Sequence, residues 1–199
     1  MARIGLGKIL AGVAGVAAAG AAWIYLRDRG VETPPHETIE TDGHFELRRY
    51  PSIVVAQTIQ AGSRDRAMGN GFGLLADYIF AEGREGDEIR ATAPVFLVAE
   101  STRSVVRFYM PAGSTIESLP QPGEGIELVE LQPRTVALIR FGGRADERLV
   151  IQKEAELRSW LSGRGIEPAG PAEHAFYNSP IIPGPLRHNE VMIEVDLTK

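Results

Sequence analysis

The sequence predicts an α+β fold, a distorted antiparallel β-barrel made of two pseudo-symmetric strand–helix–strand halves with one main helix each. The strongest observation is an internal repeat, because residues 46–83 superpose on residues 128–165 at a constant offset of 82. In that register Pro51 falls on Pro133. Each copy runs through a proline-led apolar strand, a segment with helical spacing and a terminal glycine. Two copies of one unit require a shared core, and the seam between them is a natural place for a ligand cleft.

The composition is that of a folded protein and excludes several kinds of chemistry. Of the 199 residues, 44% are hydrophobic and 24% are charged, which is ordinary for a globular chain. The chain contains no cysteine. Disulfides, thiolate catalysis, cysteine-based zinc sites and covalent haem attachment are therefore excluded.

Residues 1–29 are predicted to be a membrane anchor or a signal segment, in the form of an apolar N-terminal helix. Residues 9–26 are 18 residues without a charge, which reaches the lower end of the length of a membrane-spanning helix. Trp23 and Tyr25 lie where an interfacial aromatic belt is expected. A cleaved signal peptide and a soluble or amphipathic helix are alternatives. An uncleaved anchor places the domain outside the cytoplasm, in the periplasm, whereas signal cleavage makes it a secreted protein.

The rest of the chain is acidic. Residues 1–29 carry four of the 21 basic and one of the 26 acidic side chains, which leaves 17 against 25 and a formal net charge of −8. Nucleic-acid binding depends on attraction to phosphates and is therefore not expected. Residues 30–43 are polar with a Pro-Pro pair, so we expect a linker between the anchor and a domain spanning residues 44–199.

In the first half, alternating apolar residues predict the strands and a helical repeat of apolar residues predicts one helix. Met68, Phe72, Leu75 and Ile79 give the helical spacing. The predicted elements are strands at 45–49, 53–59, 89–98 and 105–110 and a helix at 64–80.

The second half follows the same order after a Pro- and Gly-rich connection at 111–125. The predicted elements are strands at 126–131, 135–141, 175–177 and 190–197 and a helix at 146–162. Residues 167–173, rich in Pro and Gly, are interpreted as a loop, and His174 directly after them is assigned to the same loop.

Three glycines in the first predicted helix are unusual, because each costs up to about 1 kcal/mol of helix propensity relative to alanine. They are Gly69, Gly71 and Gly73. Two interpretations are open. Either the helix begins only near Gly71, or the glycines leave a smooth surface that a flat ring approaches closely.

Several motifs occur in the order and spacing of a known family. They are Phe45–Pro51, Gly71–Leu75, Tyr78–Ile79, Thr92–Val95, Phe108–Pro111, Phe141–Gly143, Tyr177–Pro180 and Arg187–Val191. On these motifs, which cover about residues 43–197, the chain resembles the SOUL/haem-binding protein family, in a bacterial form with an N-terminal membrane anchor. The resemblance implies a barrel with internal repeats at about 44–111 and 126–197. Similar halves occur in the effector-binding domains of bacterial transcription regulators.

The resemblance also implies non-covalent binding of haem or a related tetrapyrrole in an apolar cleft beside the first helix, in a carrier or sensor role. The residues expected at that cleft are Met68, Gly69, Phe72, Leu75, Phe108 and Met110, with His44 as a candidate axial ligand. One branch of the family is thought to ligate iron through a histidine where this chain has Arg49, which stays protonated. Another branch carries Arg and Lys where Gly69 and Asp77 stand here. The family's usual contacts to haem are therefore missing here, so the ring can be held by apolar burial without a protein axial ligand, and the iron ligand stays undetermined.

Two functions of other classes stay open. An enzyme on the same scaffold needs a buried carboxylate with a raised pKa or a tyrosine general acid, for which Glu46, Glu190, Tyr109 and Tyr177 are the candidates. An envelope interaction module without a small ligand predicts a filled seam between the halves. The sequence shows no nucleophile triad and no helical histidine pair, and it leaves the oligomeric state open.

Overall fold

The computed structural model describes residues 30–100, 102–179 and 181–197. The segment predicted to be an anchor or signal, residues 1–29, lies outside the described residues. Among the helices of the described part, none has the length and apolar character needed to cross a bilayer.

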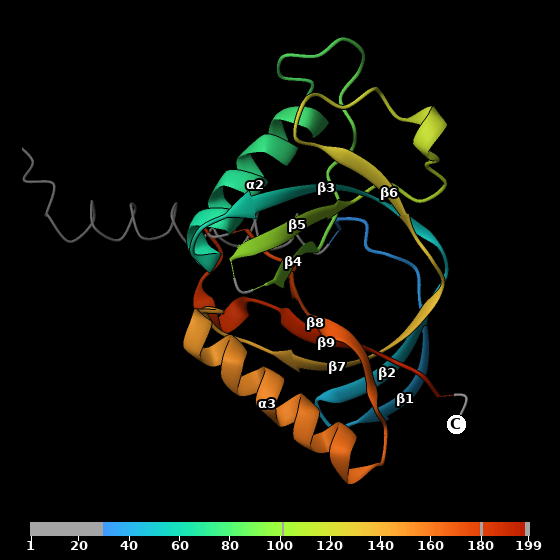
Figure 1. Cartoon of the computed structure of the whole chain (residues 1–199), viewed down its shortest axis with the longest axis vertical. Coiled ribbons are helices and arrows are strands. Elements are labelled where there is room, and N and C mark those ends of the chain that lie inside the picture. The colour runs from blue at the N-terminus through green and yellow to red at the C-terminus, as the bar shows by residue number, and fades with distance from the viewer. Residues whose placement is uncertain (1–29, 101, 180, 198–199) are drawn as a thin grey trace, which may run out of the picture.

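A strongly curved antiparallel sheet carries two long helices (Figure 1), which confirms the predicted α+β class and the barrel-like sheet. The strands are β1 (Glu37–Asp42), β2 (Phe45–Tyr50), β3 (Ile53–Ala61), β4 (Val95–Ala99), β5 (Arg103–Tyr109), β6 (Glu127–Leu131), β7 (Arg134–Phe141), β8 (Pro168–Phe176) and β9 (Asn189–Val195). The helices are α2 (Arg64–Ile79) and α3 (Glu147–Gly163), with short 3₁₀ turns η1 (Ile116–Ser118) and η2 (Gly184–Leu186).

The order of the strands in the sheet is symmetric about its middle. The full order is β1-β2-β7-β9-β8-β4-β5-β3-β6. Without β1, it reads β2-β7-β9-β8 from one end and β6-β3-β5-β4 from the other, which are corresponding strands of the two halves. Each half gives its first strand to the other half, because β2 pairs with β7 and β6 pairs with β3. The two halves therefore complete one continuous sheet that neither forms alone.

The two helices lie on the outer face of the sheet, and the inner face is concave (Figure 1). Helix α2 packs against β3 and β5, and α3 packs against β7 and β9. Three apolar clusters fill the protein, one beneath each helix and one on the concave face. Because side chains alternate along a strand, each central strand supplies residues to both faces.

The glycines of α2 have two different roles. A Cβ atom on Gly71 would lie 2.6 Å from Cγ2 of Val106, so this glycine permits the close approach of the helix to β5. A Cβ on Gly69 or Gly73 would meet nothing within 4 Å. Helix α2 already begins at Arg64, so the interpretation of a late helix start is wrong. Gly69 and Gly73 are exposed and leave open space on the solvent side of the helix.

The expected linker contains a strand. Residues 37–42 form β1, which pairs antiparallel with β2 at the edge of the sheet. The segment before β1 is also attached to the fold, because Glu32 and Thr92 form a parallel bridge. An edge strand is held by backbone hydrogen bonds to one neighbour and can expose its side chains, so it needs no apolar residues. The polar composition of residues 37–42 therefore gave no sign of a strand.

Two predicted boundaries in the sheet are wrong. Residues 168–173, expected to be a loop, are the first part of β8, where a register shift against β9 accommodates the Pro and Gly residues. The strand expected from residue 89 begins only at Val95. Residues 89–94 run outside the strands, and the bond between Ala93 and Pro94 is cis.

Candidate functional site

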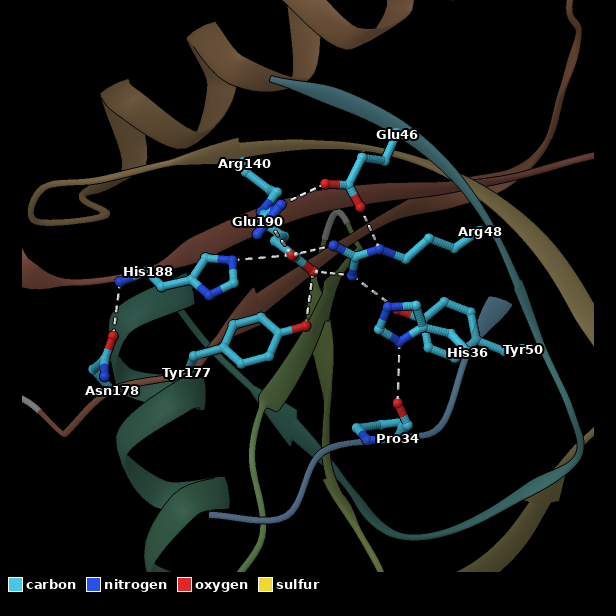
Figure 2. Close-up of polar contacts among 10 residues, drawn as sticks. All are labelled: Pro34, His36, Glu46, Arg48, Tyr50, Arg140, Tyr177, Asn178, His188 and Glu190. Carbon is cyan, nitrogen blue, oxygen red and sulfur yellow. Dashed lines mark hydrogen bonds and ion pairs between the residues drawn. The ribbon is translucent and has the colours of Figure 1, made fainter. Parts of the chain in front are cut away.

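A buried network of ionic and hydrogen-bonded side chains lies at one end of the concave face (Figure 2). Its first members come from β2, where polar residues alternate with an apolar one. Leu47 packs in the cluster beneath α3, so Glu46, Arg48 and Tyr50 point to the opposite face. Glu190 of β9 meets them there, although 142 residues separate it from Arg48 in the chain.

Arg48 and Glu190 form the centre of this network. Arg48 donates from Nη2 to Oε1 of Glu190 at 3.0 Å and from Nη1 to Oε2 at 3.2 Å. It also donates from Nε to Glu46 at 2.7 Å and from Nη1 to the hydroxyl of Tyr50 at 3.2 Å. The paired side chains are 5% and 0% exposed. A buried ion pair is tolerated only when its hydrogen bonds are satisfied, and this one meets that condition.

Tyr177 and His188 complete the surroundings of Glu190. The hydroxyl of Tyr177 donates to Oε2 at 2.7 Å, and Nε2 of His188 lies 3.0 Å from Oε1. The two rings stack, with centroids 4.2 Å apart and planes 3° apart. The backbone N–H of His188 donates to Oδ1 of Asn178 at 2.7 Å. Both oxygens of Glu190 therefore accept from protein donors.

Arg140 of β7 forms the outer edge of the network. It donates from Nη1 to Oε1 of Glu46, and its Nε lies 3.9 Å from Oε1 of Glu190. Its side chain is 46% exposed. With Arg48, the two arginines formally balance the two glutamates.

The electrostatics keep these groups charged. Burial alone raises the pKa of Glu190, but the hydrogen bond from His188 and the charge of Arg48 outweigh it and hold that pKa below its usual value. Burial lowers the pKa of Arg48, but the negative charge of Glu190 and the hydrogen bonds to Tyr50 and Glu46 outweigh it and raise that pKa above its usual value. Burial and the negative charge of Glu190 raise the pKa of Tyr177 well above its usual value. Glu190 is therefore not the carboxyl with a raised pKa that the enzyme hypothesis requires, and Tyr177 holds its proton tightly.

A cavity of about 540 Å³ opens beside the network. Its far wall is the segment 31–38, which we call the strap. The carbonyl of Glu32 accepts from the N–H of Ala93 at 2.8 Å, and its carboxylate accepts from the N–H of Ala112. The ring of His36 lies 5.3 Å from that of Tyr50 (Figure 2). The cavity thus lies between the sheet and the strap.

A second ionic cluster lies at the opposite end of the concave face. Glu173 accepts from Arg107 at 2.8 Å and from Arg134 at 2.6 Å. A smaller cavity of about 320 Å³ adjoins it. Along β9, Glu190 lines the first cavity and Glu194 the second, so the two cavities are at different ends of the same strand.

Most of the residues predicted at a tetrapyrrole cleft gather around α2. Leu75 and Met110 are fully buried between α2 and the sheet, with Phe108 nearly buried and Met68 partly buried against them. Phe72 is 45% exposed, and its ring meets Phe108 edge to face at a centroid distance of 5.3 Å. The structure therefore places an exposed aromatic ring above a buried one, beside the exposed glycines. Contact of these residues with a cofactor stays a prediction.

His44 does not lie with that group. It occupies the exposed turn between β1 and β2, where its carbonyl accepts from the N–H of Arg140 at 2.9 Å. Glu156 of α3 lies within electrostatic reach of His44, so His44 lies on the side of the other helix.

His174, expected in a loop, is instead buried in β8 on the helix-covered face. It is 6% exposed, and neither ring nitrogen has a hydrogen-bond partner in the described part of the chain. Arg64 of α2 and Glu154 of α3 flank it, with Nε2 of His174 3.9 Å from the Glu154 carboxylate. Burial and the charge of Arg64 lower the pKa of His174 to about 4, so the ring is neutral at neutral pH.

The sequence identified only part of the concave network. Three of the four candidates for an enzyme, Glu46, Glu190 and Tyr177, do come together, whereas Tyr109 lies in the apolar cluster of the concave face. The sequence did not single out Arg48 and Arg140, and it indicated for His188 only a role in ordering its loop. Charged residues at the alternate positions Glu46 and Arg48 of β2 were the available signal, because a strand that is apolar on one face directs such residues to the opposite face.

The profile of one protein family matches most of the chain. It is described as SOUL heme-binding protein and covers residues 31–194. No curated protein sequence matches the chain.

Solved structures share the fold at low sequence identity. The crystal structure of the EcmrR C-terminal domain superposes with a TM-score of 0.57 at 11% identity, over 76% of this chain and 96% of that one. The crystal structure of a hydrolase from Listeria innocua superposes with a TM-score of 0.55 at 12% identity, over 79% of this chain and 94% of that one. At such identities the similarity establishes the fold alone.

Proposed function

The chain belongs to the SOUL heme-binding protein family, and from this premise we propose that it binds haem or a related tetrapyrrole non-covalently on the outer face of α2. Membership of the family supports tetrapyrrole binding in general. The position of the ring, the absence of a protein axial ligand and a role as carrier or sensor are parts of the proposal. The observation that carries the position is the exposed ring of Phe72 beside two exposed glycines, Gly69 and Gly73.

The outer face of α2 suits a flat apolar ring. Gly69, Phe72 and Ala76 follow one another at spacings of three and four residues, so they form one stripe along the helix. Open space above Gly69 and Gly73 lets a macrocycle approach the helix backbone beside Phe72. Phe108 supports the Phe72 ring from below. An exposed aromatic ring held in place by an edge-to-face contact is a good partner for a porphyrin face.

The energy of such binding comes from burial. Removing apolar surface from water contributes about 25 cal/mol per Å², before the costs of association are subtracted. Asp65 precedes Gly69 by one turn and Asp77 follows Gly73 by one turn, and both disfavour carboxylates there. Arg66 lies two turns before Gly73 on the same side of the helix, and it is the cation that we assign to a propionate.

A titration of the full-length chain with haemin tests the proposal. In detergent solution, with a detergent-only blank, we expect a saturable shift of the Soret band at micromolar protein. Phe72→Ala removes the exposed ring and should weaken binding about tenfold, which corresponds to the loss of an aromatic contact of about 1.4 kcal/mol. Gly73→Leu fills the open space beside that ring and should weaken binding at least as much by blocking the approach of the macrocycle. Ile151→Ala is the matched control, because Ile151 is a 60% exposed residue on the other helix.

Two outcomes would contradict the proposal. One is the lack of any saturable Soret change in the wild-type chain. The other is equal affinity in the wild type, Phe72→Ala and Gly73→Leu, which would move the tetrapyrrole away from α2.

We also propose that residues 9–26 attach the protein to a membrane and that the domain lies outside the cytoplasm. The support is the uncharged length of that segment with its aromatic and basic flanks. Fractionation of cells that express the full-length chain, followed by protease treatment of spheroplasts, tests both parts. Recovery in the soluble fraction contradicts the anchor, and protection of the domain from protease contradicts the orientation.

A further inference from the structure

The cavity beneath the strap is separate from the outer face of α2. It opens on the concave side of the sheet, and the residues predicted for a tetrapyrrole do not line it. Its volume of about 540 Å³ lies within the range of small-molecule sites, about 300–1,000 Å³. Ionisable groups with shifted pKa values gather at its wall, which is typical of functional sites.

The carboxylate oxygens of Glu46 and Glu190 at the cavity wall already accept hydrogen bonds from protein donors. Each oxygen of Glu190 accepts two hydrogen bonds, from Arg48 and either Tyr177 or His188. Glu46 accepts from Arg48 with one oxygen and from Arg140 with the other. A cationic ligand would therefore have to displace a protein donor that is already in place.

The donors at the wall are less fully used. Arg140 makes one hydrogen bond to Glu46 through Nη1, whereas a guanidinium has five N–H groups, and nearly half of its side chain is exposed. The rings of His36 and His188 also face the cavity. The N–H donors of Arg140 that remain free can therefore bind an acceptor that carries negative charge. A carboxylate fits a guanidinium in two parallel hydrogen bonds.

The rest of the wall accepts a ring. Tyr177 and His188 form a flat stacked pair on one side, and His36 lies near Tyr50 on the strap side. Aromatic rings in such positions favour a planar ligand by offset or edge contacts. We propose that this cavity is a second binding site, for a small aromatic carboxylate whose acid group pairs with Arg140 and whose ring lies against Tyr177 and His188.

Calorimetric titration of the full-length chain with benzoate and 1-naphthoate tests this proposal. We expect saturable binding of these acids, and no binding of benzamide, which lacks the charge, or of benzylamine, which carries the opposite charge. Arg140→Gln should reduce the affinity for the acids at least tenfold. Arg158→Gln is the matched control, because Arg158 is an exposed arginine of α3 that pairs with Glu154 away from the cavity.

A second variant distinguishes loss of binding from loss of folding, in case Arg140→Gln fails to fold. Thr38 lines the cavity from the exposed edge strand β1 and takes no part in the ionic network, so Thr38→Phe fills space without removing a charge. Thermal unfolding of each variant without ligand shows whether it folds. Binding of the acids should be lost in Thr38→Phe at unchanged thermal stability.

The proposal is overturned if the acids fail to bind the wild type at millimolar concentration, if they bind Arg140→Gln as well as the wild type, or if benzylamine binds in their place. A haemin titration in saturating benzoate separates the two sites. Unchanged haemin affinity supports separate sites, whereas competition, or loss of haemin binding in Arg140→Gln, would mean that this cavity takes a tetrapyrrole propionate and is not a second site.

Discussion

Burial of a neutral histidine predicts a specific acid sensitivity of this fold. His174 is enclosed between α2 and α3, where burial and Arg64 lower its pKa from 6.5 to about 4, against the smaller opposing effects of Glu154 and Glu173. The unfolded chain binds the proton at a higher pH than the folded chain. Stability is therefore full above the unfolded pKa of 6.5 and is lost as the pH falls from there towards 4.

The magnitude follows from the two pKa values. A difference between 6.5 and about 4 amounts to about 3 kcal/mol when the pH reaches the folded value, and to about 2 kcal/mol between pH 7 and pH 5. In His174→Leu this contribution is absent. Urea denaturation at pH 7, 6 and 5 should show that the wild type loses about 2 kcal/mol more of its unfolding free energy than the variant does over that range.

His44→Leu serves as the control, because it removes a histidine that is exposed in a turn. The unfolding free energy of this variant should follow that of the wild type at pH 7, 6 and 5. Parallel loss of stability in the wild type and His174→Leu would refute the assignment of a neutral, unpartnered ring to this position. Other groups also titrate in acid, and the difference between the two proteins removes their contribution.

Five other substitutions give graded outcomes in the same denaturation assay. Gly71→Ala should destabilise the fold by about 1–3 kcal/mol through overlap with the β5 side chain beneath it, whereas Gly73→Ala should stabilise it by up to about 1 kcal/mol, and equal effects would contradict the two roles of these glycines. Asp146→Ala should cost about 1 kcal/mol, because the Asp146 side chain accepts from the third N–H of α3. Ser63→Ala should cost almost nothing, because Ser63 makes no such bond at the start of α2. Arg48→Met should cost about 3–5 kcal/mol by leaving two buried carboxylates without their shared cation, and a change below 1 kcal/mol would contradict the account of the concave network.

Local patterns in the sequence predicted the elements that dominate the fold. The helical spacing of Met68, Phe72, Leu75 and Ile79 identified α2 to within one residue at its end. The internal repeat identified two similar halves around a common sheet. These features depend on neighbours within one element, so a single sequence carries them.

Features that depend on distant pairing were not predicted. No local pattern shows that β2 pairs with β7 of the other half, since this is set by how the two cores pack together. Pro168 and Gly170 are ordinary loop residues, and only the shifted register against β9 places them in a strand. Glu46 and Glu190 were both noticed, but the bridge that Arg48 makes between them was not predicted, because the Arg48–Glu190 pair spans 142 residues and leaves no spacing to recognise.

The two proposed sites use opposite faces of one sheet. The tetrapyrrole is assigned to the outer face of α2, and the aromatic acid to the concave face beneath the strap. Strands β3 and β5 lie beneath α2, whereas β2 and β9 carry the ionic network. Substitutions at one site should therefore leave binding at the other unchanged, as expected for separated positions without shared partners.

Hydrogen–deuterium exchange of the full-length chain, with and without haemin, tests the assigned position of the tetrapyrrole most directly. We expect slower exchange in peptides that cover α2, residues 64–79, and unchanged exchange in α3, residues 147–163. Protection confined to α3 or to the strap, with none in α2, would contradict it.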